Sequence, residues 1–133
     1  VTCDTSYGCE DVQGGSCQSP PLNGIGGVSA NRWGWYLEPT FDSTDQSFTF
    51  DMYAGAGQND LSSGAFAGNV VVTVNHDGSS DYTVHPADGY CFDDVHLHVG
   101  NELPTKKNGT PTVAPGKYTQ STLHDGPFYI IVH

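Results

Sequence analysis

Two histidines separated by one residue, His96 and His98, are the residues whose types and spacing most directly suggest chemistry. They lie in the segment 95–99, Val-His-Leu-His-Val. Because successive side chains of a β-strand point to opposite faces, this pattern predicts a strand with one apolar face and one imidazole face. Two imidazoles on one face bind a transition-metal ion when His85 or His133 adds a third ligand from a neighbouring strand. The alternative is that both rings lie on the solvated face of a half-buried strand.

Three aspartates, Asp88, Asp93 and Asp94, lie in the turn before this segment. Calcium binds carboxylate and carbonyl oxygens, and short acidic side chains in loops are a common source of them, although the spacing here matches no EF-hand loop. We therefore expect calcium as the one candidate cofactor, bound by Asp88, Asp93 and Asp94. Together with His96 and His98, the candidates for a transition metal, these are the metal-ligand candidates of the sequence. The alternative is that these acids are solvated and only initiate Asx-turns.

Hydrolase chemistry has little support in the sequence. No Gly-x-Ser-x-Gly nucleophile elbow is present. Glycosidases need two facing carboxylates, usually with one of them in an apolar setting. Glu38, beside Trp35 and Tyr36, is the only acid in such company, and its partner carboxylate is unidentified. We therefore expect no enzymatic activity.

An aromatic cluster at residues 33–36 offers a different kind of site. Trp33, Trp35 and Leu37 would share one face of a short strand. With Tyr36, the two indoles would form a platform for a sugar ring, which would make glycans the partner. The alternative is that these aromatic side chains belong to the core, as tryptophan usually does.

Four cysteines, an even number, indicate an oxidising compartment. Three of them, Cys3, Cys9 and Cys17, lie in the Gly/Ser/Pro-rich segment 1–31, which shows no strand or helix periodicity. Such a segment buries too little apolar surface to hold itself in place, so we expect disulfides to attach it. If all four cysteines pair, one of the three reaches Cys91 and the other two close a local loop, and the sequence leaves that choice open.

Alternating apolar and polar residues predict the strands that position these groups. Residues 47–53 alternate as in a strand with one solvated face. Residues 70–75 and 81–85 predict a hairpin around Asp-Gly. Apolar pairing across it favours three or five loop residues, with Val74 opposite Tyr82.

The final segment, residues 128–133, is apolar on both faces, which is typical of a strand buried between two layers. Roughly seven or eight short strands separated by turn residues, without a helical period, predict an all-β fold. We expect an antiparallel β-sandwich of jelly-roll-like or Ig-like type over residues 32–133. Residues 1–31 would be an extension tied to it by disulfides.

Charge and hydropathy exclude some partners. The 133 residues include four Lys/Arg and fifteen Asp/Glu, for a net charge of −11. Nucleic-acid binding needs a basic patch, an anionic membrane repels such a surface, and no apolar run reaches the roughly 20 residues that span a bilayer. We therefore expect neither nucleic acid nor membrane insertion.

The chain begins with Val and shows no signal peptide, so we expect a processed, secreted or cell-surface protein. Asn108 begins an Asn-Gly-Thr sequon for glycosylation. Its alternative interpretation is a simple Asn-Gly turn.

Three motifs occupy roughly the last third of the chain: Val-His-Leu-His-Val-Gly at 95–100, Gly-Thr-Pro-Thr-Val-Ala-Pro-Gly-Lys-Tyr at 109–118, and the apolar strand ending at His133. Together they resemble a domain of uncharacterised secreted and cell-surface proteins. In that domain a strand ending in Val-Gly precedes a Gly-x-Pro-Thr-Val-Ala-Pro-Gly-x-Tyr/Phe motif and a closing apolar strand that carries a histidine. The resemblance implies a secreted surface protein and assigns no catalytic residue.

These observations lead us to expect an extracellular structural protein, a subunit of a surface filament or matrix that forms a homo-oligomer or polymer. A final strand that is apolar on both faces suits insertion into a neighbouring subunit's sheet. The residues of this assembly strand would be Phe128, Ile130, Ile131 and Val132. The alternative function is a carbohydrate-binding β-sandwich module that depends on calcium.

Overall fold

The computed structural model describes residue 3 and residues 5–133. Within this part the regular elements are strands and short 3-10 helices, and the strands of each sheet are antiparallel. The predicted all-β, antiparallel sandwich with a disulfide-attached N-terminal segment is therefore confirmed. Among the described residues, we find no helix with the length and hydropathy required to cross a membrane.

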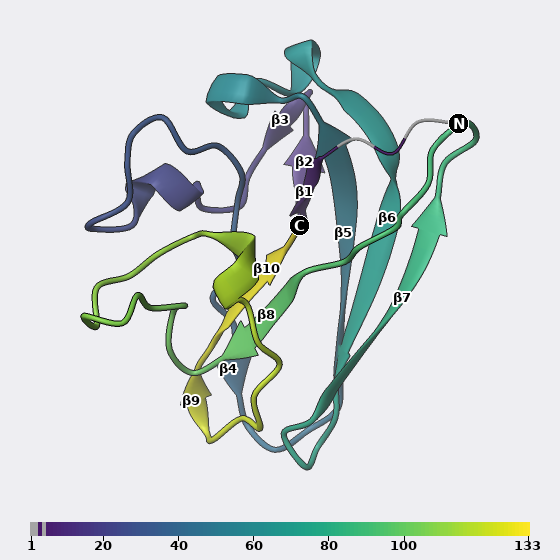
Figure 1. Cartoon of the computed structure of the whole chain (residues 1–133). Helices are drawn as coiled ribbons and strands as arrows, with labels where there is room; N and C mark the ends of the chain where they lie inside the picture. The colour runs from purple at the N-terminus through teal and green to yellow at the C-terminus, as the bar shows by residue number, and fades with distance from the viewer. Residues whose placement is uncertain (1–2, 4) are drawn as a thin grey trace.

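The main sheet has four strands in the order β1-β5-β6-β7 (Figure 1). The strands are β1 (Ser6–Cys9), β5 (Gln46–Ala54), β6 (Ala65–Val74) and β7 (Ser80–Pro86). Alternation along β5 buries Phe50 and Met52 and leaves Ser47 and Thr49 exposed, as the sequence pattern predicts. The inner face of the sheet is therefore the apolar one.

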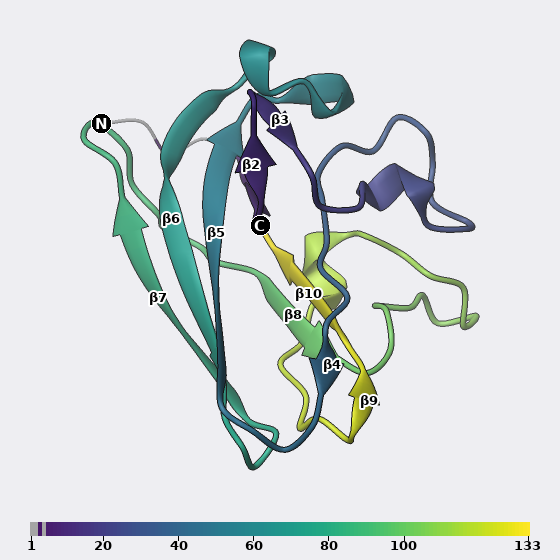
Figure 2. The same cartoon turned by 180° about the vertical axis from the view of Figure 1, so that it is seen from behind.

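A second, smaller layer crosses that inner face (Figures 1 and 2). It contains the pairs β8 (Leu97–Gly100) with β10 (Tyr129–Val132) and β4 (Thr40–Phe41) with β9 (Gly126–Pro127). The remaining elements are β2 (Val12–Gln13), β3 (Ser16–Cys17), η1 (Leu22–Gly24), η2 (Gly57–Asn59), η3 (Leu61–Ser63) and η4 (Pro115–Lys117). These elements lie mostly in the loops around the two layers.

Strand β10 separates two clusters of buried apolar side chains. Ile130 packs in the larger cluster, between the main sheet and the second layer, with Val70, Val72 and Val99 among its members. Ile131 packs in the smaller cluster, which the N-terminal segment completes. Both side chains are 0% exposed. The prediction that the final segment is buried on both faces is confirmed.

The proposed role of this segment as an assembly strand is corrected by the hydrogen bonding of its edges. One edge of β10 pairs with β8. On the other edge, the Leu37 N–H donates to Ile130 O at 2.9 Å and the Ile130 N–H donates to Leu37 O at 2.9 Å. At Ile130 both edges are paired within the same chain, and the buried side chains of Phe128, Ile130, Ile131 and Val132 belong to the core of their own domain.

The β6–β7 hairpin has a loop of five residues, 75–79, so the predicted odd loop length is correct. The pairing differs by two residues: Val72, not Val74, lies opposite Tyr82. Two contacts inside the loop account for this. The Gly78 N–H donates to Asn75 O at 2.9 Å, and the Ser79 N–H donates to Asp77 Oδ1 at 3.0 Å, so the turn closes near Asp77-Gly78.

Candidate functional site

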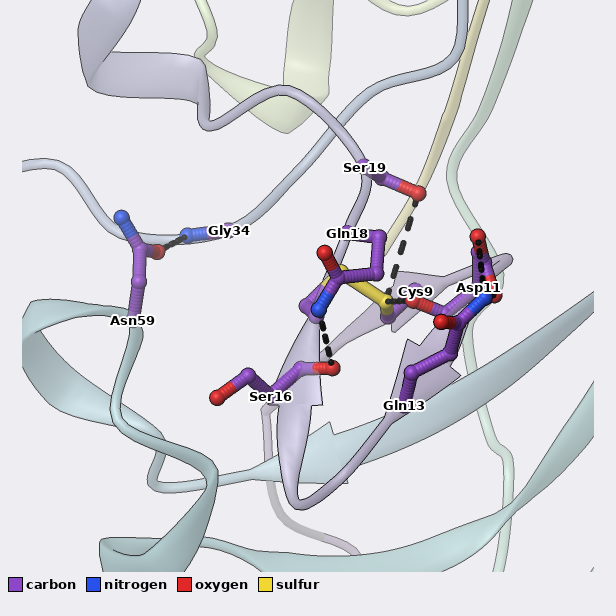
Figure 3. Close-up of a disulfide and its surroundings, with 9 residues drawn as sticks. Cys9, Asp11, Gln13, Ser16, Gln18, Ser19, Gly34 and Asn59 are labelled. Carbon is purple, nitrogen blue, oxygen red and sulfur yellow. Dashed lines mark hydrogen bonds between the residues drawn. A yellow bond between two sulfur atoms is a disulfide. The ribbon is translucent and has the colours of Figure 1, made fainter.

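Two disulfides attach the N-terminal segment: Cys3–Cys91 and Cys9–Cys17. The first joins the segment to the stretch before β8, and the second closes a local loop, which is the division that the sequence predicted. Figure 3 shows Cys9 beside Ser19, whose Oγ lies 4.0 Å from the Cys9 sulfur. The same segment also supplies β1, so it is part of the main sheet as well as being held by disulfides.

His98 has a structural role. Its ring is 4% exposed, its Nε2–H donates to Glu102 O at 2.8 Å, and its Nδ1 accepts from the Thr119 N–H at 3.4 Å. Burial lowers the pKa of His98, against the smaller opposing effect of the hydrogen bond to Glu102. Because both ring nitrogens are occupied, the predicted sharing of one metal ion by His96 and His98 is corrected.

His96 instead lies beside His133. The His96 N–H donates to His133 O at 2.9 Å and the His133 N–H donates to His96 O at 3.0 Å, which extends the β8–β10 ladder by one residue pair. The two Nδ1 atoms lie 3.4 Å apart. Burial, and then the neighbouring His96 ring, lower the pKa of His133.

A cavity of about 290 Å³ opens at these two imidazoles. Its lining combines acidic, apolar and sulfur-containing groups, including Asp93, Asp94, Met52 and the Cys3–Cys91 disulfide. Within residues 3 and 5–133, Asp93 is the one predicted calcium ligand that lies near two other potential ligand atoms, and those atoms are the two sulfurs of the disulfide. Since a disulfide offers no thiolate, this group is not a metal centre.

The other predicted calcium ligands are separate, exposed side chains. Asp88 and Asp94 are exposed, and in the part of the chain that the structure describes neither one belongs to a group of three acidic, histidine or cysteine ligand atoms within 4.8 Å. Calcium binding therefore stays a prediction from charge alone.

The aromatic cluster is largely core. Trp35 is 2% exposed and Trp33 is half-buried, with ring centroids 6.0 Å apart at 78°. The segment forms isolated bridges in place of the predicted strand, because Gly34 adopts a φ of +117° between the two indoles. The Trp33–Trp35–Tyr36 sugar platform is therefore corrected: Trp35 cannot stack on a ligand.

The sequon lies in an exposed turn. Asn108 Oδ1 accepts from the Thr110 N–H at 3.1 Å and from the Thr110 hydroxyl at 2.7 Å. Gly109 between them has a φ of +85°, so the turn interpretation is correct. Glycosylation of Asn108 stays a prediction, and the exposure of the side chain is compatible with it.

Among the residues that the structure describes, strand β7 is a free edge of the main sheet. Six of its seven residues are exposed. Tyr82 and Val84 pair with Val72 and Val70 and therefore belong to the inner face, yet they are 39% and 37% exposed. The second layer stops short of β7, so the sheet extends beyond its own cover.

The hydrogen-bond pattern between β6 and β7 determines which backbone groups of β7 point outward at this edge. The Asn75 N–H donates to Ser79 O and the Ala87 N–H donates to Ala67 O, one at each end of the hairpin. In an antiparallel pair the bonded residues alternate with residues whose N–H and C=O point away. Asp81, Thr83 and His85 therefore bond to β6, and residues 80, 82, 84 and 86 point outward.

At the two ends of this edge, one backbone group each is unavailable for pairing with a further strand. Ser80 O accepts from Gln120 Nε2 at 3.1 Å, and Pro86 has no N–H to offer. The open hydrogen-bonding groups are therefore concentrated on Tyr82 and Val84, the same residues whose apolar side chains are exposed. The sequence predicts this segment as a strand but not as an edge, because alternation does not reveal strand order.

Comparison with family models, with curated proteins and with solved structures finds no match for this chain. The resemblance of its last third to a secreted surface domain stays a prediction. The free edge of β7 and the His96–His133 pair are the two arrangements whose geometry supports a function.

Stability should fall as the pH drops below the ordinary histidine pKa of about 6.5. The pKa values of His98 and His133 are lowered in the folded state, so the unfolded chain binds more protons at pH values between the folded and unfolded pKa values. His98→Gln should reduce this pH dependence, and the exposed control His124→Gln should keep it. Urea denaturation between pH 5 and pH 8 measures it, and equal slopes for His98→Gln and the unsubstituted protein would contradict the assignment.

Proposed function

We propose that this chain is an extracellular structural protein whose copies associate through the free edge of β7. The observation that carries the proposal is a coincidence on Tyr82 and Val84: their outward backbone groups have no partner among the described residues 3 and 5–133, and their apolar side chains are exposed. Strand edges of this kind bind a further strand by main-chain hydrogen bonds.

A second copy of β7 fits this edge in one antiparallel register. Placing Tyr82 opposite Val84 of the other copy, and Val84 opposite its Tyr82, forms four main-chain hydrogen bonds around a two-fold axis at Thr83. At each end Ser80 then lies opposite Pro86. Pro86 has no N–H to donate to the Ser80 carbonyl of the other copy. Gln120 already donates to that carbonyl, so no acceptor is left unpaired.

The side chains are self-complementary in the same register. On the inner face, Tyr82 meets Val84, an aromatic–β-branched pair. On the outer face, Thr83 meets Thr83 and Asp81 meets His85. The aromatic–β-branched pair and the Thr–Thr pair belong to classes that are favourable by about 0.2–1 kcal/mol. The Asp81 carboxylate can accept a hydrogen bond from the imidazole of His85.

Neighbouring registers are worse. With Tyr82 opposite Tyr82, the Val84 N–H faces the Ser80 carbonyl that Gln120 occupies. With Val84 opposite Val84, the Tyr82 carbonyl faces Pro86, which has no donor. The edge therefore favours a single mode of self-association.

Two features support the extracellular part of the proposal. Both disulfides close on residues of the same chain, and they persist in oxidising compartments. The net charge of −11 suits a soluble surface protein that repels anionic membranes.

A two-fold pair closes on itself, so a filament needs a second contact. A smaller cavity of about 170 Å³ lined by Arg32 and Lys106 gathers two of the four Lys/Arg residues of the chain. This positive site is complementary to the acidic surface of a neighbouring pair.

Val84→Pro should abolish the pair and preserve the fold. The Val84 N–H points away from β6, so proline removes an edge donor without removing a ladder bond. Val84→Thr, which keeps the N–H and the β-branched shape, is the matched control and should still associate. Sedimentation velocity over a concentration series measures the outcome, with the fold checked by circular dichroism.

Charge variants test the register if Val84→Pro fails to fold. His85→Asp places like charges opposite Asp81 of the other copy and should weaken association. Adding Asp81→Lys to His85→Asp places opposite charges across the interface and should recover association. A protein that stays monomeric at millimolar concentration, or pairing unaffected by all of these substitutions, would rule the proposal out.

A further inference from the structure

The strongest arrangement outside the β7 edge is the pair of imidazoles His96 and His133. They project from adjacent ends of β8 and β10 and are held by two backbone hydrogen bonds of 2.9 and 3.0 Å. The Tyr7 ring packs edge-on against the His133 ring at a centroid distance of 4.7 Å. The positions of both rings are therefore defined by the fold.

The separation of their nitrogens fits two ligands of one metal ion. The Nδ1 atoms are 3.4 Å apart, close enough for one ring to donate a hydrogen bond to the other when no ion is bound. Two nitrogens bound to one tetrahedral zinc ion at 2.0–2.1 Å are about 3.4 Å apart. One ion can therefore replace the shared proton without moving either ring.

The surroundings suit a cation. The imidazoles open into the cavity of about 290 Å³, and Asp93 and Asp94 line the same cavity. In the described part of the chain no third histidine, cysteine or carboxylate ligand atom lies within 4.8 Å of both nitrogens, so water would complete the coordination.

We propose that His96 and His133 bind one divalent transition-metal ion of the zinc–copper class through their Nδ1 atoms. The ion would join the end of β8 to the end of β10, and water would hold its remaining positions inside the cavity. Imidazole ligands favour these ions over calcium, which prefers oxygen. The site is independent of the β7 edge, because it uses no residue of that strand.

Zinc titration of the whole protein tests the site. We expect zinc to raise the melting temperature, because an ion that binds only the folded state stabilises it. His96→Asn and His133→Asn should each weaken zinc binding by about tenfold or more. His76→Asn and His124→Asn, at exposed histidines, are matched controls and should leave it unchanged. Isothermal titration calorimetry measures the affinities.

A second measurement needs no substitution. Long-range ¹H–¹⁵N spectra of the histidine rings should show zinc-dependent shifts at the Nδ1 atoms of His96 and His133, and none at His98, whose nitrogens are occupied. Absence of zinc and copper binding, or shifts confined to other histidines, would overturn the proposal.

Discussion

Ile130→Ala and Ile131→Ala are each expected to lower the free energy of unfolding by about 3–4 kcal/mol. The two side chains point to opposite faces of β10 and are both 0% exposed. Ile130 leaves a cavity between the layers, and Ile131 leaves one under the N-terminal segment. In most strands only one face is buried, so truncating side chains at consecutive residues gives one large and one small loss of stability. Large losses at both residues indicate a strand that is buried on both faces.

Chemical denaturation of the two variants measures these losses. Phe66→Ala is the control, because it also truncates a large apolar side chain. Phe66 is 47% exposed, so this substitution should lower the free energy of unfolding by about 1 kcal/mol or less. A large loss of stability at one isoleucine combined with a negligible loss at the other would show that β10 has a solvated face. That result would contradict the burial of both side chains.

Gly68→Ala is expected to cost about 4 kcal/mol or more, for two reasons. Gly68 has a φ of +127°, which side chains rarely adopt. An added Cβ would also lie 2.3 Å from His85 O and 2.7 Å from Ala87 N. Both are backbone atoms at the end of β7, so the strand would have to move away from β6.

Gly126→Ala separates these two causes. Gly126 has a φ of +121°, close to that of Gly68, but nothing lies within 4 Å of an added Cβ. It should cost only the conformational strain, about 1–3 kcal/mol. Thermal or urea unfolding of both variants gives the difference, and equal losses would mean that the close approach of β7 to Gly68 does not matter.

Gly68 lies against the end of β7, so Gly68→Ala should also affect association through the exposed edge of that strand. Pro86 lies opposite Gly68 in the ladder. Displacement of β7 at this point would disturb the outward-pointing groups of Val84 and Tyr82, so any folded fraction of this variant should also associate less.

Local patterns account for much of the fold. The alternation at 47–53 identified β5 and its inward face, and the apolar run at 128–133 identified a strand covered on both sides. The clustering of three cysteines at the N-terminus predicted one long-range and one local disulfide. Each of these follows from side-chain period or composition, which neighbouring residues determine.

The candidate sites depended on contacts between distant residues. Spacing predicted His96 with His98, but register places His96 opposite His133, 37 positions away, and His98 in the interior. The aromatic run around Trp35 predicts a strand, but Gly34 with its positive φ makes it an irregular core segment.

The sequence by itself determined the all-β class, the faces of the strands, the double burial of the final segment and the division of the cysteines. Only the tertiary structure decided which cysteine pairs with Cys91, which histidines meet, and that β7 rather than β10 presents a free edge. The physical reason is that the alternation of side chains is a property of each strand alone. Strand order and the extent of the covering layer are properties of the whole packed chain.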